Sequence, residues 1–110
     1  MINAAQFKMR PGVLELIAGI ALSRVEGASG VGFRSDHPED TRKRKYLTKG
    51  IKVEVEEERL GYEIEVNLDY GKDFNEIGIM IQRDVKGAVE AMTGWRVDTV
   101  DVNVVGVNTT

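Results

Sequence analysis

The residues most able to bind a charged partner gather in one short stretch of this sequence. Positions 34 to 49 hold six basic and three acidic residues, so the stretch carries +3 while the whole chain carries −3. Such side chains bind phosphates or anionic lipid headgroups in a salt-dependent way, and a solubilising loop is the alternative interpretation. The candidate partner-binding residues are Arg42, Lys43, Arg44, Lys45 and Lys49.

A glycine pattern offers a second route to nucleic-acid binding. Gly27-Ala28-Ser29-Gly30 matches the GxxG of KH-type RNA-binding domains, in which a loop between two helices clamps the nucleotide backbone. The following residues, Val31–Pro38, lack a helical pattern, so the end of a helix is the simpler interpretation. A small RNA-binding module using Gly27–Gly30 and Arg42–Lys49 is kept as the alternative hypothesis, although we do not expect nucleic acid to be the partner.

Few residues could support catalysis or metal binding. The chain has no cysteine and one histidine, His37, which precedes a proline in the charged stretch. A zinc site needs three or four nitrogen, sulfur or oxygen ligands, and no EF-hand spacing of acidic residues is present. We therefore expect no catalytic residue, no metal, no cofactor and no enzymatic activity.

The first half of the chain predicts a short strand and one helix. Phe7 and Met9 alternate with basic residues over Ala5–Arg10, which indicates a strand. Pro11 suits the first turn of a helix over Val13–Val25, which has an apolar stripe that faces the core. This helix is apolar around most of its circumference, so Leu16 and Leu22, which lie outside the stripe, are candidates for self-association. The predicted stripe contains Val13, Leu14, Ile17, Ile20 and Ala21.

The apolar run in this helix is too short for a membrane span. Val13–Leu22 is interrupted by Glu15 and has about half of the ~20 residues that a span needs. The first residues also lack the basic start and apolar run of a secretory signal. We therefore expect a cytoplasmic protein without a span.

A β-hairpin follows the charged stretch. Apolar and polar residues alternate over Ile51–Val55 and again over Tyr62–Tyr70, with Glu57–Gly61 as the turn. The polar positions predict an acidic sheet face in contact with water, which already accounts for the carboxylates without a metal. This face would carry Glu54, Glu56, Glu63, Glu65 and Asp69.

A second helix and a last strand complete the pattern. Asp73 or Asn75 can cap a helix that ends at Gly94, and its predicted stripe is Phe74, Ile77, Ile81, Val85, Ala88 and Met92. Ile79 lies about 140° from Phe74 and should face away from the core, which makes it a third candidate for self-association. Trp95 is either a packing anchor or an interface residue. In the strand Arg96–Val107 the valines change parity, which predicts a bulge near Val104–Gly106.

The order of these elements predicts the fold. It is β-α-β-β-α-β, or α-β-β-α-β if the first strand does not form. Either order gives a two-layer α+β sandwich with two helices on one face of a small mixed or antiparallel sheet. At 110 residues the chain fits a single domain, residues 1–110. Residues 34–48 lack any period, and we expect a mobile loop there.

Several segments together resemble a known bacterial family. The chain reads PGVLELIAGIALSRVEGASGV, KGIKVEVEEE, DVKGAVEAMTGW and VDVNVVGV in order. These segments resemble the alkaline-shock-protein family, also described as envelope stress response proteins of mostly Gram-positive species. The resemblance runs from about Met9 to Val107. The charged segment SDHPEDTRKRKY departs from the family pattern, so partner contacts made there by other members are not carried over.

The resemblance implies a role without supplying a reaction. It implies an abundant cytoplasmic protein that in some members is held at the inner face of the membrane by a separate anchoring protein. It also implies self-association in some members and involvement in envelope homeostasis or alkaline stress, and it carries no catalytic residues. We therefore expect a non-enzymatic assembly or scaffold module, a homo-oligomer that acts through protein–protein contacts.

Overall fold

The structure, a computed structural model, describes residues 9–32 and 44–109. Met9 and Arg10 belong to no strand, and the rest of the strand predicted over Ala5–Arg10 lies outside the described residues. The elements in chain order are α1 (Val13–Ser23), β1 (Ala28–Gly30), α2 (Arg44–Leu47), β2 (Ile51–Glu56), β3 (Arg59–Asp69), α3 (Phe74–Thr93) and β4 (Arg96–Asn108).

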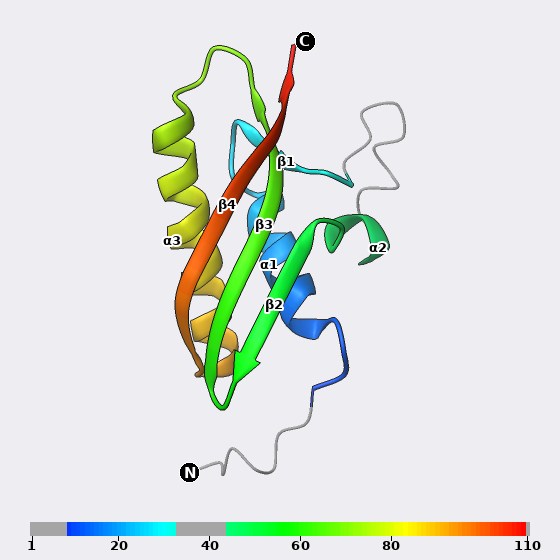
Figure 1. The fold of residues 1–110 in the computed structure, drawn as a ribbon, viewed down its shortest axis with the longest axis vertical. Helices are drawn as coiled ribbons and strands as arrows, with labels where there is room; N and C mark the ends of the chain where they lie inside the picture. Colours follow the sequence, from blue (N-terminus) through cyan, green and yellow to red (C-terminus); the bar gives the residue numbers. More distant parts are fainter. Residues whose placement is uncertain (1–8, 33–43, 110) are drawn as a thin grey trace.

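The elements form two layers. Figure 1 shows the long strands on one side and the helices α1 and α3 together on the other. This arrangement confirms the predicted α+β two-layer sandwich. In the described part of the chain no helix lies over the opposite face of the sheet, where Glu54, Glu56, Glu63 and Glu65 are exposed and Asp69 is half-buried.

The strand β3 organises the sheet because it is paired along both edges. On one edge β4 runs parallel to it from Arg59 to Asp69, with α3 as the crossover connection. On the other edge β2 pairs antiparallel with the first part of β3, and β1 pairs antiparallel with Val66–Leu68. Between these two partners, the N–H of Glu65 donates to the carbonyl oxygen of Gly50 at 2.9 Å. The strands β1 and β2 therefore follow one another along the same edge.

The predicted hairpin is confirmed, but its turn is shorter than predicted. Glu56 pairs with Arg59, so Glu57 and Glu58 alone connect the strands, and Glu57 takes a positive φ of 58°. Two-residue hairpin turns require this left-handed conformation because it matches the twist of the strands. The residues Arg59–Gly61, predicted as turn, belong to β3.

The core lies between β3 and the two helices. The period of two in β3 is confirmed, since its alternate residues are at most 1% exposed: Leu60, Tyr62, Ile64, Val66 and Leu68. The helix α3 contributes Ile77, Ile81, Val85 and Val89. Phe74 and Met92, which the predicted stripe placed in the core, are 41% and 72% exposed. They lie in the first and last turns, where the helix reaches its ends, and Val89 takes the place predicted for Met92.

The orientation of α1 differs from the predicted stripe. Ile20 is 38% exposed, whereas Ala18 and Leu22 are at most 2% exposed and belong to the core. Leu22 was predicted on the surface, and this placement is wrong. A helix that is apolar on nearly all sides gives a weak indication of which side faces the sheet.

Part of the predicted loop is ordered against α1. A Cβ on Gly19 would overlap the carbonyl oxygen of Leu47, the last residue of α2, and a Cβ on Gly32 would overlap the main chain of Tyr46. These two glycines therefore allow α2 to lie directly against α1 and the end of β1. Residues 34–43 of the predicted loop lie outside the described residues.

The predicted ends of α3 and the predicted bulge in β4 are confirmed. Asp73 accepts hydrogen bonds from the N–H groups of Asn75 and Glu76 at 2.9 and 3.2 Å, and Gly94 ends the helix with φ 73°. The register of β4 against β3 shifts between Val104 and Gly106, so Val105 is the extra residue of the predicted bulge.

Candidate protein interaction surface

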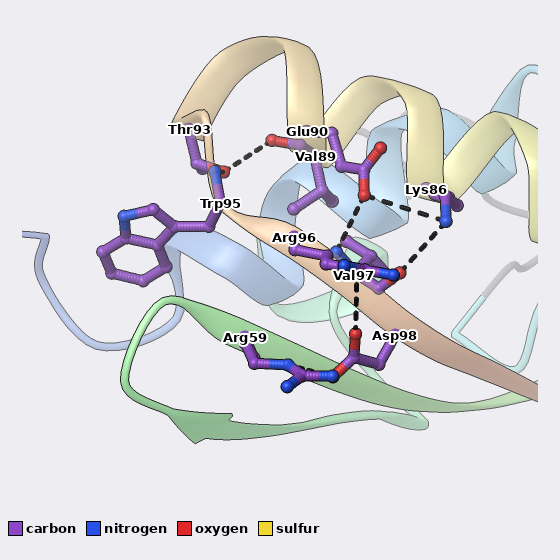
Figure 2. A network of polar contacts seen from close by, with 9 residues as sticks. All are labelled: Arg59, Lys86, Val89, Glu90, Thr93, Trp95, Arg96, Val97 and Asp98. Atoms are coloured by element: carbon purple, nitrogen blue, oxygen red, sulfur yellow. Dashed lines mark hydrogen bonds and ion pairs between the residues drawn. The ribbon is translucent and has the colours of Figure 1, made fainter.

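The outer edge of β4 is covered over its first half by side chains of α3. The N–H of Val97 donates to Glu90 Oε2 at 2.9 Å, and Lys86 Nζ donates to the carbonyl oxygen of Val97 at 3.3 Å. One turn earlier in the helix, Gln82 Nε2 donates to the carbonyl oxygen of Val100 at 3.0 Å. Figure 2 shows Lys86 and Glu90 reaching down from the helix to Val97. These contacts occupy main-chain groups that a neighbouring strand would otherwise pair with.

The connection from α3 into β4 is held by a second set of contacts. Thr93 Oγ1 donates to the carbonyl oxygen of Val89 at 2.7 Å and accepts from the N–H of Trp95 at 3.0 Å. The indole of Trp95 points away from this network in Figure 2, and it is half-buried against the core. Trp95 therefore packs at the boundary of the core.

Asp98 joins the start of β3 to the start of β4. Its carboxylate lies 2.8 Å from Arg59 Nε and 3.4 Å from Arg96 Nε. The hydrogen bond from Arg59 lowers the pKa of Asp98, and the same contact raises the pKa of Arg59. Asp98 is the extra residue at the first register shift of β4, between the positions paired with Leu60 and Gly61. The bulge thus turns this carboxylate toward two guanidinium groups on the surface.

The second half of β4 has a different character. Val104, Val105 and Val107 are 43%, 53% and 45% exposed, and no charged residue occurs from Val102 to Asn108. The N–H of Tyr70 donates to the carbonyl oxygen of Asn108 at 2.9 Å, which places the exposed residue Tyr70 beside the end of this strand.

Exposed apolar residues concentrate at this end of the molecule. Figure 1 shows that the first turns of α3 and the last residues of β4 lie at the same end. Most of the large exposed apolar residues of the described chain belong to these two elements or to the connection that precedes α3: Tyr70, Phe74, Ile79, Val104, Val105 and Val107. Ile79 also borders a shallow hollow between α3 and β4 that Val100 and Asp101 line. The gathering of exposed apolar residues makes this end of the molecule the candidate interaction surface.

The three residues predicted to take part in self-association differ in their exposure. Ile79 is 54% exposed, as predicted, and belongs to this apolar end. Leu16 is half-buried on α1, and Leu22 is in the core. The valines of β4 were missed as surface residues because their alternation indicates only a strand. Recognising them required knowing that β4 is an edge strand.

The candidate basic residues are described only in part. Lys45 and Lys49 are exposed near α2, and Lys45 Nζ lies 5.0 Å from the centre of the Tyr46 ring. Arg44 begins α2. Arg42, Lys43 and His37 lie outside the described residues. Their proposed role in binding a partner stays a prediction.

The glycine pattern does not form an RNA clamp. Ala28–Gly30 is the strand β1, paired with Val66–Leu68, and the carbonyl oxygen of Gly27 accepts from the N–H of Asp69 at 2.8 Å. A KH-type clamp needs a loop between two helices. Here the segment extends the sheet, so the GxxG part of the RNA hypothesis lacks its structural basis.

Comparison with protein-family models identifies the family of this chain. The model of the alkaline shock protein 23 family, described by a cell envelope-related function, matches residues 2–109. The chain belongs to the alkaline-shock-protein family. Its function is related to the cell envelope.

Two relatives match this alkaline-shock family member over most of its length. The uncharacterized protein Spy1535 of Streptococcus pyogenes serotype M6 is 33% identical over 98 residues, which cover 88% of this chain and 74% of the relative. The uncharacterized protein YqhY of Bacillus subtilis is 24% identical over 107 residues, covering 96% of this chain and 78% of the relative. No solved structure matches the chain.

None of the helices within residues 9–32 and 44–109 is long and apolar enough to cross a membrane. Over the same residues, no group of three or more acidic or histidine side chains lies close enough to hold a metal ion.

Proposed function

We propose that this alkaline-shock family protein is a non-enzymatic assembly module that works in a cell-envelope process through protein–protein contacts, including contacts between its own copies. The observation that carries the proposal is the apolar end formed by α3 and β4. There, half-exposed valines stand on an uncharged strand at the same end of the molecule as the first turns of α3, which carry Phe74 and Ile79. Covering apolar surface of this kind with another protein surface lowers the free energy of the assembly.

The hydrogen bonds of polar side chains support an architectural role. Within the described residues every buried side-chain nitrogen or oxygen has a hydrogen-bond partner. The Tyr62 hydroxyl, which lies in the core, donates to a helix carbonyl oxygen, and the side chains of Gln82, Lys86 and Glu90 are bonded to β4. These groups hold the fold together and are not left pointing into an empty cavity.

The place of action follows from the same proposal. A cytoplasmic module with an apolar end can be held at the inner face of the membrane by an anchoring protein, without a span of its own. The basic residues beside α2, including Lys45 and Lys49, would then face anionic headgroups or the anchor.

Size-exclusion chromatography with light scattering tests self-association, and affinity purification from envelope-stressed cells tests partner binding. We expect a dimer or larger species at micromolar concentration, together with a specific co-purifying protein. A strict monomer at high concentration with no partner recovered would overturn the proposal.

A further inference from the structure

The outer edge of β4 changes from covered to open along its length. The main-chain groups of Val97 and Val100 point away from β3, since they bond to side chains of α3. Main-chain direction alternates along a strand, so the groups of Val102 and Val104 point the same way. No side chain in the described structure bonds to these two residues. The open edge, defined here as Val102–Val107, therefore presents unpaired donors and acceptors.

The open edge also lacks the features that usually prevent strand pairing. Natural edge strands carry charges, prolines or covering elements that block the approach of another strand. The other long free edge, β2, has only six residues and carries Lys52, Glu54 and Glu56. The first half of β4 carries Arg96, Asp98 and Asp101 in addition to its cover from α3. From Val102 to Asn108 neither a charge nor a proline is present.

We propose that the open edge of β4 pairs with the open edge of a second copy, antiparallel across a two-fold axis, to make one sheet that continues through both molecules. The inference rests on the proposed function, because it assigns the surface through which copies of the module associate. The main chains supply the hydrogen bonds, and the half-exposed valines of the two copies bury one another on the helix-covered face.

A second copy fits this edge for electrostatic and geometric reasons. The chain carries −3, yet the segment from Val102 to Asn108 is neutral, so two copies meet there without like-charge repulsion. An antiparallel two-fold pair brings the open halves together and sends the covered halves in opposite directions. In Figure 1 the red end of β4 continues past the first turn of α3.

A lysine placed on the open edge tests the pairing. In the full chain, Val104→Lys puts a charge where two copies meet, and Val55→Lys puts the same charge on the edge strand β2. The two valines are matched, being 43% and 52% exposed and paired with core residues of β3. Sedimentation equilibrium should show a dissociation constant raised about tenfold or more for Val104→Lys and unchanged for Val55→Lys. Equal weakening by both variants would overturn the assignment.

Amide hydrogen exchange of the unmodified protein gives a second measure that does not depend on how a variant folds. The N–H groups of Val102 and Val104 should exchange rapidly in dilute solution and slow down with association. Unchanged exchange at these two amides across the association range would overturn edge pairing, whatever the variants do.

The outcomes separate this inference from the proposed function. If the protein self-associates but Val104→Lys has no effect, the assembly module stands and the edge assignment fails. If the unmodified protein is monomeric and a partner is recovered from cells, edge pairing between copies also fails while the module remains. Only a monomer without any partner removes both.

Discussion

The hydroxyl of Tyr62 on β3 donates a 2.9 Å hydrogen bond to the main-chain carbonyl oxygen of Leu14 on α1. Tyr62 is 1% exposed and has Val53 and Val100 as its neighbours on the adjoining strands. Its ring therefore fills the centre of the core while its hydroxyl fixes the first turn of α1 over the sheet. A buried hydroxyl needs such a partner, because an unsatisfied polar group in the core is costly.

Removing this hydroxyl should weaken the protein without changing its fold. Tyr62→Phe keeps the ring but deletes the donor to Leu14, so we expect the free energy of unfolding to fall by about 1 kcal/mol. Urea unfolding followed by circular dichroism measures the loss. Tyr70→Phe, which alters a ring that is 79% exposed, is the control and should unfold like the parent. Equal stability of the Tyr62 variant and the parent would show that the bond contributes nothing net.

The same residue predicts a loss of stability in alkali. Burial, followed by the negative charge of Glu15, raises the pKa of Tyr62 above its ordinary value. The unfolded chain therefore releases this proton near pH 10 while the folded chain retains it. The stabilisation is complete below about pH 10 and declines above it by at most about 1.4 kcal/mol per pH unit. Urea unfolding at pH 8, 10 and 11 should show a shallower alkaline decline for Tyr62→Phe than for the parent. Parallel declines in the two proteins would contradict this account.

Local sequence patterns predicted the central part of the fold because the residue types there match the burial of each position. The alternation of Tyr62–Leu68, the cap at Asp73 and the parity change at Val105 each depend on neighbours in sequence. The strand β1 was missed because Ala28–Gly30 is three small residues without a period. It forms a strand only because β3 offers a free edge between Glu65, which bonds to Gly50, and Asp69, which bonds to Gly27.

Placement on the surface was harder to predict because it depends on distant contacts. Leu22 is buried and Ile20 is exposed, the reverse of the prediction, because α1 is apolar on nearly every side and the sheet determines which side is buried. The valines of β4 read as ordinary strand residues, and only the order of strands shows that their edge is open. Ile79 was placed correctly because α3 has one clear polar side.

The contact between α1 and α2 predicts opposite effects for the same substitution at two helical glycines. A Cβ on Gly19 would overlap the carbonyl oxygen of Leu47, whereas a Cβ on Gly87 meets nothing within 4 Å. Gly19→Ala should therefore cost about 1–3 kcal/mol as α2 is pushed away from α1. Gly87→Ala should stabilise the protein by about 0.5–1 kcal/mol, because alanine favours a helix interior. Thermal and urea unfolding of both variants measure the difference. A stabilising Gly19→Ala would mean that α2 does not rest on α1 in solution.

The contact between Glu90 and the covered half of β4 is also open to a sharp test. Val97 is 1% exposed, and its N–H donates to Glu90 Oε2 at 2.9 Å. Glu90→Ala leaves this buried donor without an acceptor, so the free energy of unfolding should fall by about 1–3 kcal/mol. Glu90→Gln retains an oxygen acceptor and should lose less, while Glu76→Ala removes a carboxylate from the same helix without touching β4. Urea unfolding ranks the three variants. If Glu90→Gln is as unstable as Glu90→Ala, the charge of Glu90 matters more than its contact with Val97.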